Sequence, residues 1–525
     1  MSVTPLALPD FLERVPADKI AVILPEQNIS ITYGNLREQV RAVAEQLAAA
    51  GVGRGDRVAT SLTNGLPVIV SFLAAGVAGT AAPLNPAYKE DEFRFYLEDT
   101  AAKVLLLPPD GADDARRAAV AMKVPILTIQ MDAAGTVSLS SAGSASLNSA
   151  GSASLSGERL ARTPVPPPSV DDVALVLHTS GSTGRPKRVP LKHANLSISA
   201  QNVARHYSLT ADDVSLCVMP LFHVHGLVAS TLATFASGGT VVVPAKYSPL
   251  SFWRTARDHN VTWYSAVPTL HQLLLARAGD PSDPSRRPAG TEKLRFIRSC
   301  SASLPPAVMH ALEAAFGAPV LEAYGMTEAA HQMASNPLPP SERKPGSVGH
   351  GTEVQISIMD KAGNHLPVGE AGEVVIKGPN VITGYENNPE ANASSFVDGW
   401  FRTGDQGVLD ATGYLTLVAR IKELINRGGE KISPREIDEV LLTHPAIAEA
   451  VCFGVPHGTW GEEVEAAVVL REGAAASDAD LLAFCKERLA DINRPKQSHI
   501  TQAIPRTATG KIQRGAVAKA YSTAR

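Results

Sequence analysis

A stretch rich in glycine and hydroxyl side chains follows an apolar segment in the first half of the chain. It reads HTSGSTGRPK over residues 178–187 and comes directly after VALVL, residues 173–177. Backbone N–H groups of a glycine-rich turn after a buried strand can point at phosphate. Arg185 and Pro186 separate the last glycine from Lys187, which excludes the G-x-x-x-x-G-K-[ST] nucleotide loop. The stretch predicts a phosphate-binding loop of another kind, and an ordinary surface linker is the alternative.

Five further motifs follow in order along the chain. They are PLFHVHG at 220–226, YGMTE at 324–328, GWFRTGD at 399–405, RIKELINRGGEKISPREID at 420–438 and TATGKIQR at 507–514. With the glycine stretch, their order and spacing resemble the adenylate-forming superfamily, which includes acyl-CoA synthetases, 4-coumarate–CoA ligases, luciferases and peptide-synthetase adenylation domains. The resemblance extends over essentially the whole chain.

The resemblance implies two half-reactions. A carboxylate first attacks the α-phosphate of MgATP, which gives an acyl-adenylate and pyrophosphate, and the thiol of coenzyme A then displaces AMP. ATP and coenzyme A would be co-substrates, and Glu328 would offer Mg²⁺ one hard oxygen ligand. Asp405 would accept hydrogen bonds from both ribose hydroxyls. The residues implied for ATP and AMP are Thr179, Ser180, Gly181, Ser182, Thr183, Gly184, Lys187, Glu322, Ala323, Tyr324, Thr327, Asp405 and Arg420.

The resemblance also implies a mobile C-terminal domain that carries a catalytic lysine. Lys511 would reach the adenylation site and bridge two anions, the carboxylate and the α-phosphate, which repel each other. A lone lysine in such a mixed-charge tail is otherwise usually a solvated loop residue. Thr327 and His223 are the other implied catalytic residues. Rotation about Lys422 would bring Gly428 and Gly429 to the pantetheine of coenzyme A.

Two segments depart from the common pattern of the superfamily and bear on the identity of the acid. RSCSASLPP, residues 298–306, replaces a small-residue SGAAPL-like segment, and AAH follows Glu328. If Ser301, His223 and His331 converge with Lys511, the acid pocket is small, polar and cationic, and a fatty or arylpropenoic acid would leave those groups unpaired. Both segments resemble the oxalate–CoA ligase (oxalyl-CoA synthetase) branch, which makes oxalate the expected acid. A CoA ligase for 4-coumarate or a medium-chain acid and a non-catalytic AMP-binding protein are the alternatives.

Short apolar segments alternate with helical patterns and must position these residues. VALVL, SLCVM, GTVVVP, VTWYSAV and KLRFIRS are strand candidates, and the alternation predicts an α/β fold around a mainly parallel sheet. We expect a large multi-lobed N-terminal domain with a small β-rich subdomain after Gly346, and a small α+β C-terminal domain. Ser433 and Glu436 predict a capping box for a helix that begins at Pro434. The expected boundaries are 1–419, a hinge at 420–422, and 423–525, with a low-complexity insertion at 138–160 that repeats an eight-residue unit.

Composition narrows the class of protein. The chain has 525 residues with a net charge of −4, which argues against binding to nucleic acid or an anionic membrane and favours small-molecule partners. The uncharged stretch 58–88 is interrupted by proline and glycine, so it predicts a buried helix and a strand rather than a membrane span. Four scattered cysteines predict reduced thiols. No secretory signal precedes the first motif and Thr-Ala-Arg is not a Ser-Lys-Leu address, so we expect a cytoplasmic enzyme.

Overall fold

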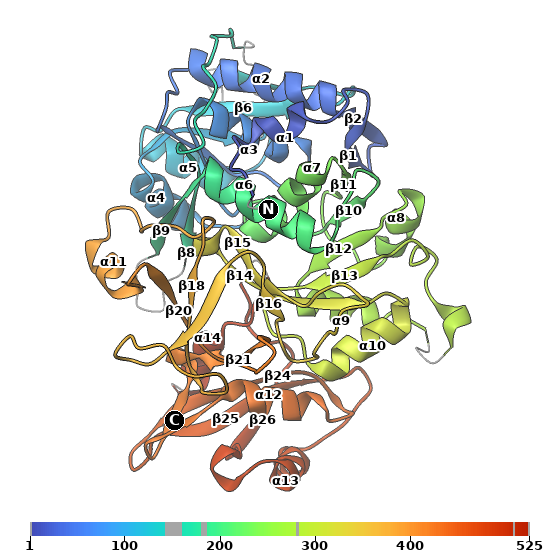
Figure 1. Cartoon of the computed structure of the whole chain (residues 1–525), viewed down its shortest axis with the longest axis vertical. Coiled ribbons are helices and arrows are strands. Elements are labelled where there is room, and N and C mark those ends of the chain that lie inside the picture. The colour runs from blue at the N-terminus through green and yellow to red at the C-terminus, as the bar shows by residue number, and fades with distance from the viewer. Residues whose placement is uncertain (1–2, 142–159, 180–185, 280–282, 508–509, 523–525) are drawn as a thin grey trace, which may run out of the picture.

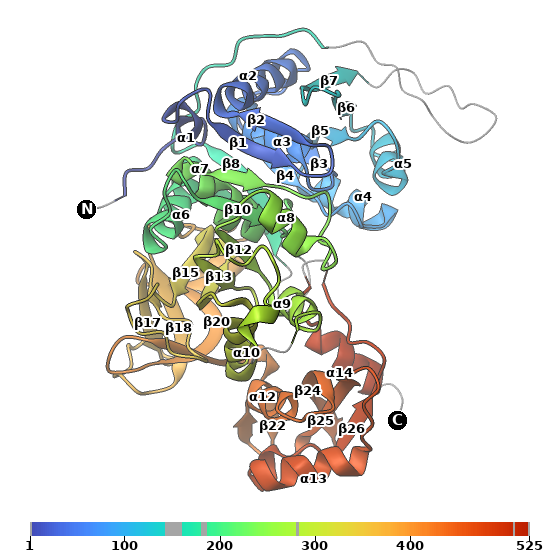
Figure 2. The ribbon, with the colours of Figure 1, turned by 90° about the vertical axis from the view of Figure 1, so that its right-hand side faces the viewer.

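The computed structural model describes residues 3–141, 160–179, 186–279, 283–507 and 510–522 (Figure 1). These residues form four sheets of nine, seven, five and five strands. Figure 2 shows three of these sheets stacked in one large body, with the C-terminal five-stranded sheet and its helices in a smaller body beneath it. The predicted α/β class, with a large multi-lobed N-terminal part and a smaller C-terminal part, is confirmed.

The seven-stranded sheet runs in the order β7-β6-β5-β3-β4-β8-β9 and is parallel except at its two edges. Its strands are β3 (Arg57–Thr60), β4 (Thr80–Pro83), β5 (Ala102–Leu107), β6 (Ile126–Met131), β7 (Val137–Ser141), β8 (Val173–Thr179) and β9 (Lys187–Lys192). The accompanying helices are α2 (Tyr33–Ala49), α3 (Leu66–Ala78), α4 (Glu90–Asp99) and α5 (Asp113–Ala121).

Two sequence predictions fall on this sheet. The uncharged stretch forms the buried helix α3 and then strand β4, as expected. No helix in the described ranges is long and apolar enough to cross a membrane. The predicted insertion begins too early, because residues 138–141 belong to β7, where Val137 and Leu139 are buried against the core and the strand pairs with β6. Residues 142–159 of that insertion lie outside the described residues.

The nine-stranded sheet runs in the order β16-β15-β14-β13-β12-β10-β11-β1-β2. It is parallel from β1 to β14, so the carboxyl ends of β10, β12, β13 and β14 meet at one edge. The strands are β1 (Ile20–Leu24), β2 (Ile29–Thr32), β10 (Val214–Cys217), β11 (Thr240–Val242), β12 (Trp263–Ala266), β13 (Phe296–Ser299), β14 (Val320–Met326), β15 (His331–Ser335) and β16 (His350–Gly351). Around it lie α1 (Pro9–Glu13), α6 (His193–His206), the π-helix η1 (His225–Leu232), α7 (Ala233–Ser237), α8 (Phe252–Asp258), α9 (Pro268–Leu275), η2 (Pro284–Arg286), α10 (Pro306–Phe316) and η3 (Thr327–Ala329).

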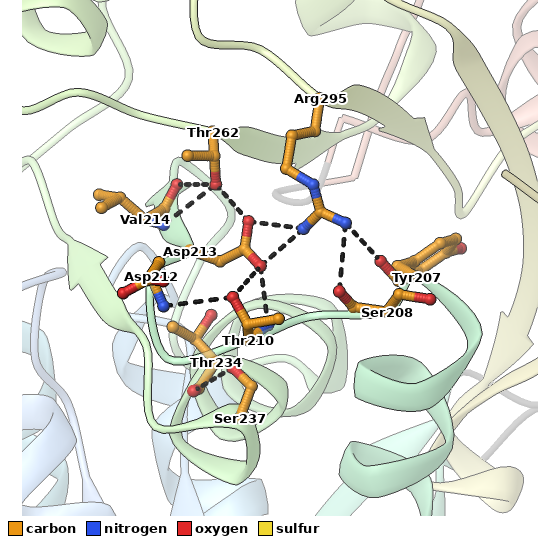
Figure 3. Close-up of polar contacts among 10 residues, drawn as sticks. All are labelled: Tyr207, Ser208, Thr210, Asp212, Asp213, Val214, Thr234, Ser237, Thr262 and Arg295. Atoms are coloured by element: carbon orange, nitrogen blue, oxygen red, sulfur yellow. Dashed lines mark hydrogen bonds and ion pairs between the residues drawn. The ribbon is translucent and has the colours of Figure 1, made fainter. Parts of the chain in front are cut away.

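An ion pair fixes the amino ends of these parallel strands (Figure 3). Arg295, just before β13, donates from Nη1 to both carboxylate oxygens of the buried Asp213 at 2.6 Å. Asp213 also accepts from the hydroxyl of Thr262 at 2.7 Å, while Arg295 Nη2 donates to the backbone carbonyls of Tyr207 and Ser208 at 3.1 Å. Since charge-assisted hydrogen bonds are directional, this network fixes the positions of β10, β12 and β13 relative to α6.

The two smaller sheets hold the last third of the chain. The β-rich subdomain expected after Gly346 contains β17 (Gln355–Met359), β18 (Gly372–Lys377), β19 (Phe396–Val397), β20 (Trp400–Leu409), β21 (Leu415–Arg420) and the short helix α11 (Pro389–Ser395). The predicted hinge lies where β21 ends and η4 (Ile421–Glu423) begins. The C-terminal body contains β22 (Ile425–Arg427), β23 (Glu430–Ile432), β24 (Ile447–His457), β25 (Gly461–Leu470), β26 (Gln497–Ile500), α12 (Pro434–Leu442), α13 (Asp478–Arg488), η5 (Asp491–Asn493) and α14 (Arg514–Ser522).

Helix α12 begins at Pro434 as predicted, but the predicted capping box is wrong. The Ser433 side chain makes no cap hydrogen bond and instead donates to the backbone carbonyl of Val418 at 2.8 Å. Because Val418 lies on β21, the serine ties the start of the C-terminal body to the preceding sheet. All four cysteines are buried and free, which confirms the prediction of unbridged thiols.

Candidate active site

A cleft lies between the carboxyl edge of the nine-stranded sheet and the C-terminal body. Residues from both sides line it, among them Ser301, Tyr324, Asp405, Arg420 and Lys511. Ser301 follows β13, Tyr324 lies on β14, and Asp405 and Arg420 lie on the neighbouring strands β20 and β21. Lys511 comes from the loop before α14. The tertiary structure therefore brings together predicted residues from four distant parts of the sequence.

Asp405 is held in a defined orientation at the edge of this cleft. It faces Arg420 across the antiparallel pair β20–β21, and Arg420 Nε lies 2.8 Å from its Oδ1. The hydroxyl of Tyr324 donates to Oδ2. Burial raises the pKa of Asp405, and the Arg420 guanidinium opposes that rise. The carboxylate is thus fixed by two donors and lines the cleft, as a group that must accept hydrogen bonds from a ligand requires.

Lys511 reaches the cleft on a loop that is docked against the N-terminal part. Arg506 Nη1 donates to the hydroxyl of Thr269 at 2.7 Å and to the backbone carbonyl of Gly510 at 2.9 Å. The pKa of Lys511 is lowered, first by burial and then by the Arg420 guanidinium, while Asp405 acts in the opposite direction. The side chain still has exposed surface, so its amine lies at an open cleft rather than in a sealed core.

A second polar group surrounds Glu328 on the turn η3. Tyr385 donates its hydroxyl proton to Glu328 Oε1 at 2.9 Å, and the hydroxyl of Thr179 lies 3.4 Å from the same oxygen. The ammonium group of Lys187 lies 4.5 Å from the centre of the Tyr385 ring. Burial lowers the pKa of Lys187, whereas the Glu328 carboxylate raises it. Thr327, on the same turn as Glu328, is also buried.

These groups fit a site for a phosphate-bound divalent cation. No cluster of three or more metal-ligating side chains occurs within the described ranges. Mg²⁺ usually keeps water and phosphate oxygens and takes only one or two protein carboxylates, so Glu328 alone is a sufficient donor. The predicted loop residues Ser180, Gly181, Ser182, Thr183 and Gly184 lie outside the described residues.

Histidines and a serine form the part of the site predicted to hold the acid. His225 Nδ1 lies 2.9 Å from Ser301 Oγ, and the rings of His225 and His331 are 5.0 Å apart. His223 accepts the backbone N–H of His225 at 3.2 Å. Burial, with a smaller contribution from Lys511, lowers the pKa of His223 to about 4. Burial and then the Arg298 guanidinium lower the pKa values of His225 and His331 well below the usual range, so all three imidazoles are neutral near pH 7.

This result changes the source of the positive charge expected in the acid pocket. Because the histidines are neutral, the charge comes from Lys511 and from Arg298, a fully buried residue of β13 that donates to His331 Nδ1 at 3.4 Å. Reasoning from the sequence missed Arg298 and did not assign His225 to the site. The second arginine of the strand pattern KLRFIRS is Arg298, and a charged residue inside an otherwise apolar strand was the signal that could have identified it.

The backbone around this pocket adopts conformations that side chains disfavour. Ser301, Ala330 and His331 have φ values of 71°, 50° and 109°. Such residues each cost about 1–3 kcal/mol and tend to persist at functional sites. Gly325 is required beside them, because a Cβ there would lie 2.2 Å from the His331 carbonyl oxygen.

The remaining predicted residues lie in different surroundings. Gly428 and Gly429 form the turn between β22 and β23, with φ values of 61° and 96°, and neither lines the cleft. Lys422 is exposed on η4. Glu322 and Ala323 lie on β14 and line the cleft beside Tyr324. The structure therefore brings together the predicted nucleotide and acid residues that it describes, and leaves the predicted coenzyme A residues apart from them.

Glu322 gives a pH-dependent prediction. Burial raises its pKa to about 7, although it accepts the backbone N–H of Leu304 at 3.1 Å. Its folded pKa exceeds the unfolded one, so the folded protein binds the extra proton, and stability falls as pH rises through this window. The loss reaches about 3 kcal/mol above pH 7. We expect Glu322→Gln to raise the unfolding temperature at about pH 8.5 and to change it little at about pH 5, as measured by thermal unfolding. An equal shift of the unfolding temperature at both pH values would contradict the prediction. Glu370→Gln, at an exposed position, is the matched control.

Comparison with known proteins adds the family context. Residues 9–386 match the model of the AMP-binding enzyme family, and residues 436–511 match that of the AMP-binding enzyme C-terminal domain. A probable CoA ligase, CCL9, from Humulus lupulus is 48% identical, and the match covers 95% of this chain and 93% of that protein. An oxalate–CoA ligase from Arabidopsis thaliana is 47% identical, with 94% of each chain covered. The crystal structure of ATP-bound MatB from Rhodopseudomonas palustris superimposes with a TM-score of 0.86 at 30% identity over 99% of each chain, and the apo form of the same protein with a TM-score of 0.75.

Proposed function

The chain belongs to the AMP-binding enzyme family, and within it we propose an oxalate–CoA ligase. Its general activity is that of an adenylate-forming acid–thiol ligase, which uses ATP to join a carboxylic acid to coenzyme A. The proposal concerns the acid, oxalate, and the roles of individual residues.

In the first half-reaction, a carboxylate oxygen of oxalate forms a bond to the α-phosphorus of ATP, and the bond from that phosphorus to the bridging oxygen of pyrophosphate breaks. We assign Lys511 to the contact between the two anions, because its amine lies near both Asp405 and His223. A cation placed beforehand where charge redistributes stabilises the transition state. Asp405 would accept from the ribose hydroxyls, with Arg420 and Tyr324 holding its carboxylate in place.

Glu328 would be the protein ligand of Mg²⁺, which neutralises phosphate charge when it is bound. Thr179 and Lys187 would contact the phosphates from the ends of β8 and β9, and Thr327 would donate to the α-phosphate. In the second half-reaction the coenzyme A thiol loses its proton and attacks the oxalyl carbonyl carbon, and AMP leaves. Gly428 and Gly429 lie away from the cleft in this structure, so their proposed contact with coenzyme A requires rotation of the C-terminal body at the hinge.

The main support for oxalate is the polarity of the acid pocket. Ser301, His225 and His331 adjoin a buried arginine, and no aromatic or aliphatic tunnel is needed to bind a two-carbon acid. Burying these polar groups against an apolar acyl chain would cost about 1–3 kcal/mol for each group left unpaired. A ligase for 4-coumarate or octanoate is therefore the weaker alternative. A non-catalytic AMP-binding protein is disfavoured because nucleotide binding alone does not require Lys511 in the cleft.

A substrate panel tests the proposal. We expect the purified chain with MgATP and coenzyme A to release pyrophosphate most efficiently with oxalate. We expect kcat/KM for 4-coumarate and octanoate to be at least about 100-fold lower, because those acids leave buried polar groups unpaired. Malonate can pair the same groups, so it tests only the size of the pocket, and its extra methylene should lower kcat/KM by about 10-fold. Pyrophosphate release and thioester formation are measured in parallel. Strong turnover of 4-coumarate or octanoate with none of oxalate would contradict the proposal.

A further inference from the structure

Arg298 is a buried cation of the nine-stranded sheet. Its side chain is fully buried on β13, and within the described ranges no Asp or Glu lies at ion-pair distance from it. Arg295, three residues earlier, is paired with Asp213 at 2.6 Å (Figure 3). A guanidinium removed from water without an anion is costly. The difference between these two arginines points to an anion that is not part of the protein.

Neutral acceptors surround the Arg298 guanidinium. Nε donates to the hydroxyl oxygen of Tyr207 at 3.0 Å, and Nη2 donates to Gln332 Oε1 at 2.9 Å. Nη1 donates to Ser265 Oγ at 2.9 Å. These contacts fix the position of the guanidinium without cancelling its charge.

The same guanidinium determines which nitrogen of each histidine carries the proton. Arginine only donates, so His331 Nδ1, 3.4 Å from Arg298 Nη2, accepts, and the proton of this neutral ring is on Nε2. Ser265 Oγ accepts from Arg298 and lies 2.6 Å from His225 Nε2, so it donates its own proton to that nitrogen. His225 then carries its proton on Nδ1.

The position of the proton on His225 in turn orients a hydroxyl group at the cleft. Its Nδ1–H donates to Ser301 Oγ at 2.9 Å, which leaves the hydroxyl proton of Ser301 available for another acceptor. Ser301 lines the cleft that Lys511 also lines. The pocket therefore offers a hydroxyl donor and a nearby uncompensated positive charge, and this combination suits a carboxylate.

We propose that Arg298 is a positioning residue that orients Ser301 and His331 as donors and supplies the charge that holds the second carboxylate of the acid. This inference rests on the proposed activation of oxalate. One carboxylate of oxalate reacts at the α-phosphate, while the other stays ionised in both half-reactions and needs a permanent partner. Arg298 would thus make the enzyme select a dianion over a monocarboxylate of the same size.

Oxamate provides the test, because it has the shape of oxalate with a neutral amide in place of one carboxylate. We expect Arg298→Gln to raise the KM for oxalate in ATP–pyrophosphate exchange by about 100-fold, since the buried charge and the orientation of the donors around it are both lost. The inhibition constant of oxamate should rise less than about 5-fold, because its amide makes no charged contact. The KM for ATP should stay within about 2-fold of wild type, since Arg298 does not line the cleft.

Two further variants separate positioning from folding. Arg298 reaches His225 Nε2 from Nη1 at 3.5 Å and His331 Nδ1 from Nη2 at 3.4 Å. Arg298→Lys keeps the charge but replaces this planar fork by a single ammonium, so we expect its KM for oxalate to rise at least about 10-fold. Arg295→Gln removes the paired arginine just before β13 and should lower the unfolding temperature without changing the preference for oxalate over oxamate.

The outcomes distinguish this inference from the proposed function. If wild type turns over other acids but not oxalate, the proposed function fails. If wild type uses oxalate and Arg298→Gln weakens oxalate and oxamate equally, Arg298 is only structural and the inference is overturned. An Arg298→Lys variant with the wild-type KM for oxalate would overturn the role of Arg298 in orienting the histidines. If Arg298→Gln does not fold, the KM of Arg298→Lys tests the inference by itself.

Discussion

Lys511→Ala is expected to reduce oxalate-dependent ATP–pyrophosphate exchange by two to three decades, which corresponds to about 3–4 kcal/mol of transition-state stabilisation. The lysine lies beside Asp405, Arg420 and His223 in the cleft, where it would contact the meeting anions only in the adenylation step. The variant should therefore form the thioester from supplied oxalyl-adenylate and coenzyme A at nearly the wild-type rate. Single-turnover measurement of each half-reaction provides the two rates.

Lys486→Ala is the matched control for this experiment, because Lys486 is an exposed lysine of helix α13 in the same C-terminal body. Both half-reactions should be unchanged in that control. An equal loss of both half-reactions in Lys511→Ala would contradict the assignment, since it would indicate damage to the C-terminal body rather than loss of a contact specific to adenylation.

Asp405→Asn is expected to raise the KM for ATP by about 10- to 100-fold, the loss expected for hydrogen bonds to a charged group. The substitution keeps the size of the side chain, but it removes the charge that Arg420 Nε contacts at 2.8 Å. Unlike Lys511→Ala, it should also slow thioester formation from supplied oxalyl-adenylate, because the ribose is present in both half-reactions.

Steady-state kinetics in ATP and a single-turnover thioester assay measure these two effects. Asp410→Asn provides the control, since Asp410 follows β20 and makes a partly exposed ion pair with Lys344 away from the cleft. A normal KM for ATP in Asp405→Asn, together with slow adenylation, would contradict the assignment of Asp405 to the ribose.

The fold was largely predictable because its main signals are local. Apolar segments such as VALVL and KLRFIRS became β8 and β13, and the uncharged stretch became the buried helix α3, since burial on both faces requires uninterrupted apolar residues. The predictions failed where a side chain had two possible partners. Ser433 could cap α12 or bond to β21, and it donates to the carbonyl of Val418 on β21. A local sequence pattern could not predict this partner, because Val418 lies outside the pattern.

The residues that we propose for the nucleotide could be selected from the sequence because each lies in a motif with a characteristic order, but their mutual contacts could not be predicted. Asp405 and Arg420 are in register only because β20 and β21 pair, and Tyr324 reaches Asp405 from a different sheet. The protonation of the acid pocket was also beyond the sequence. His225 and His331 are neutral, since burial and the Arg298 charge both lower their pKa values.

The sequence by itself determined the α/β class, the order of the elements and the kinds of chemical group available, because propensity, periodicity and motif spacing act over short distances along the chain. Only the tertiary structure decided that Arg295 meets Asp213 while Arg298, three residues later, meets no carboxylate in the described part of the chain. Electrostatic energy depends on distance in space and on burial, and both arise only when segments far apart in sequence pack together.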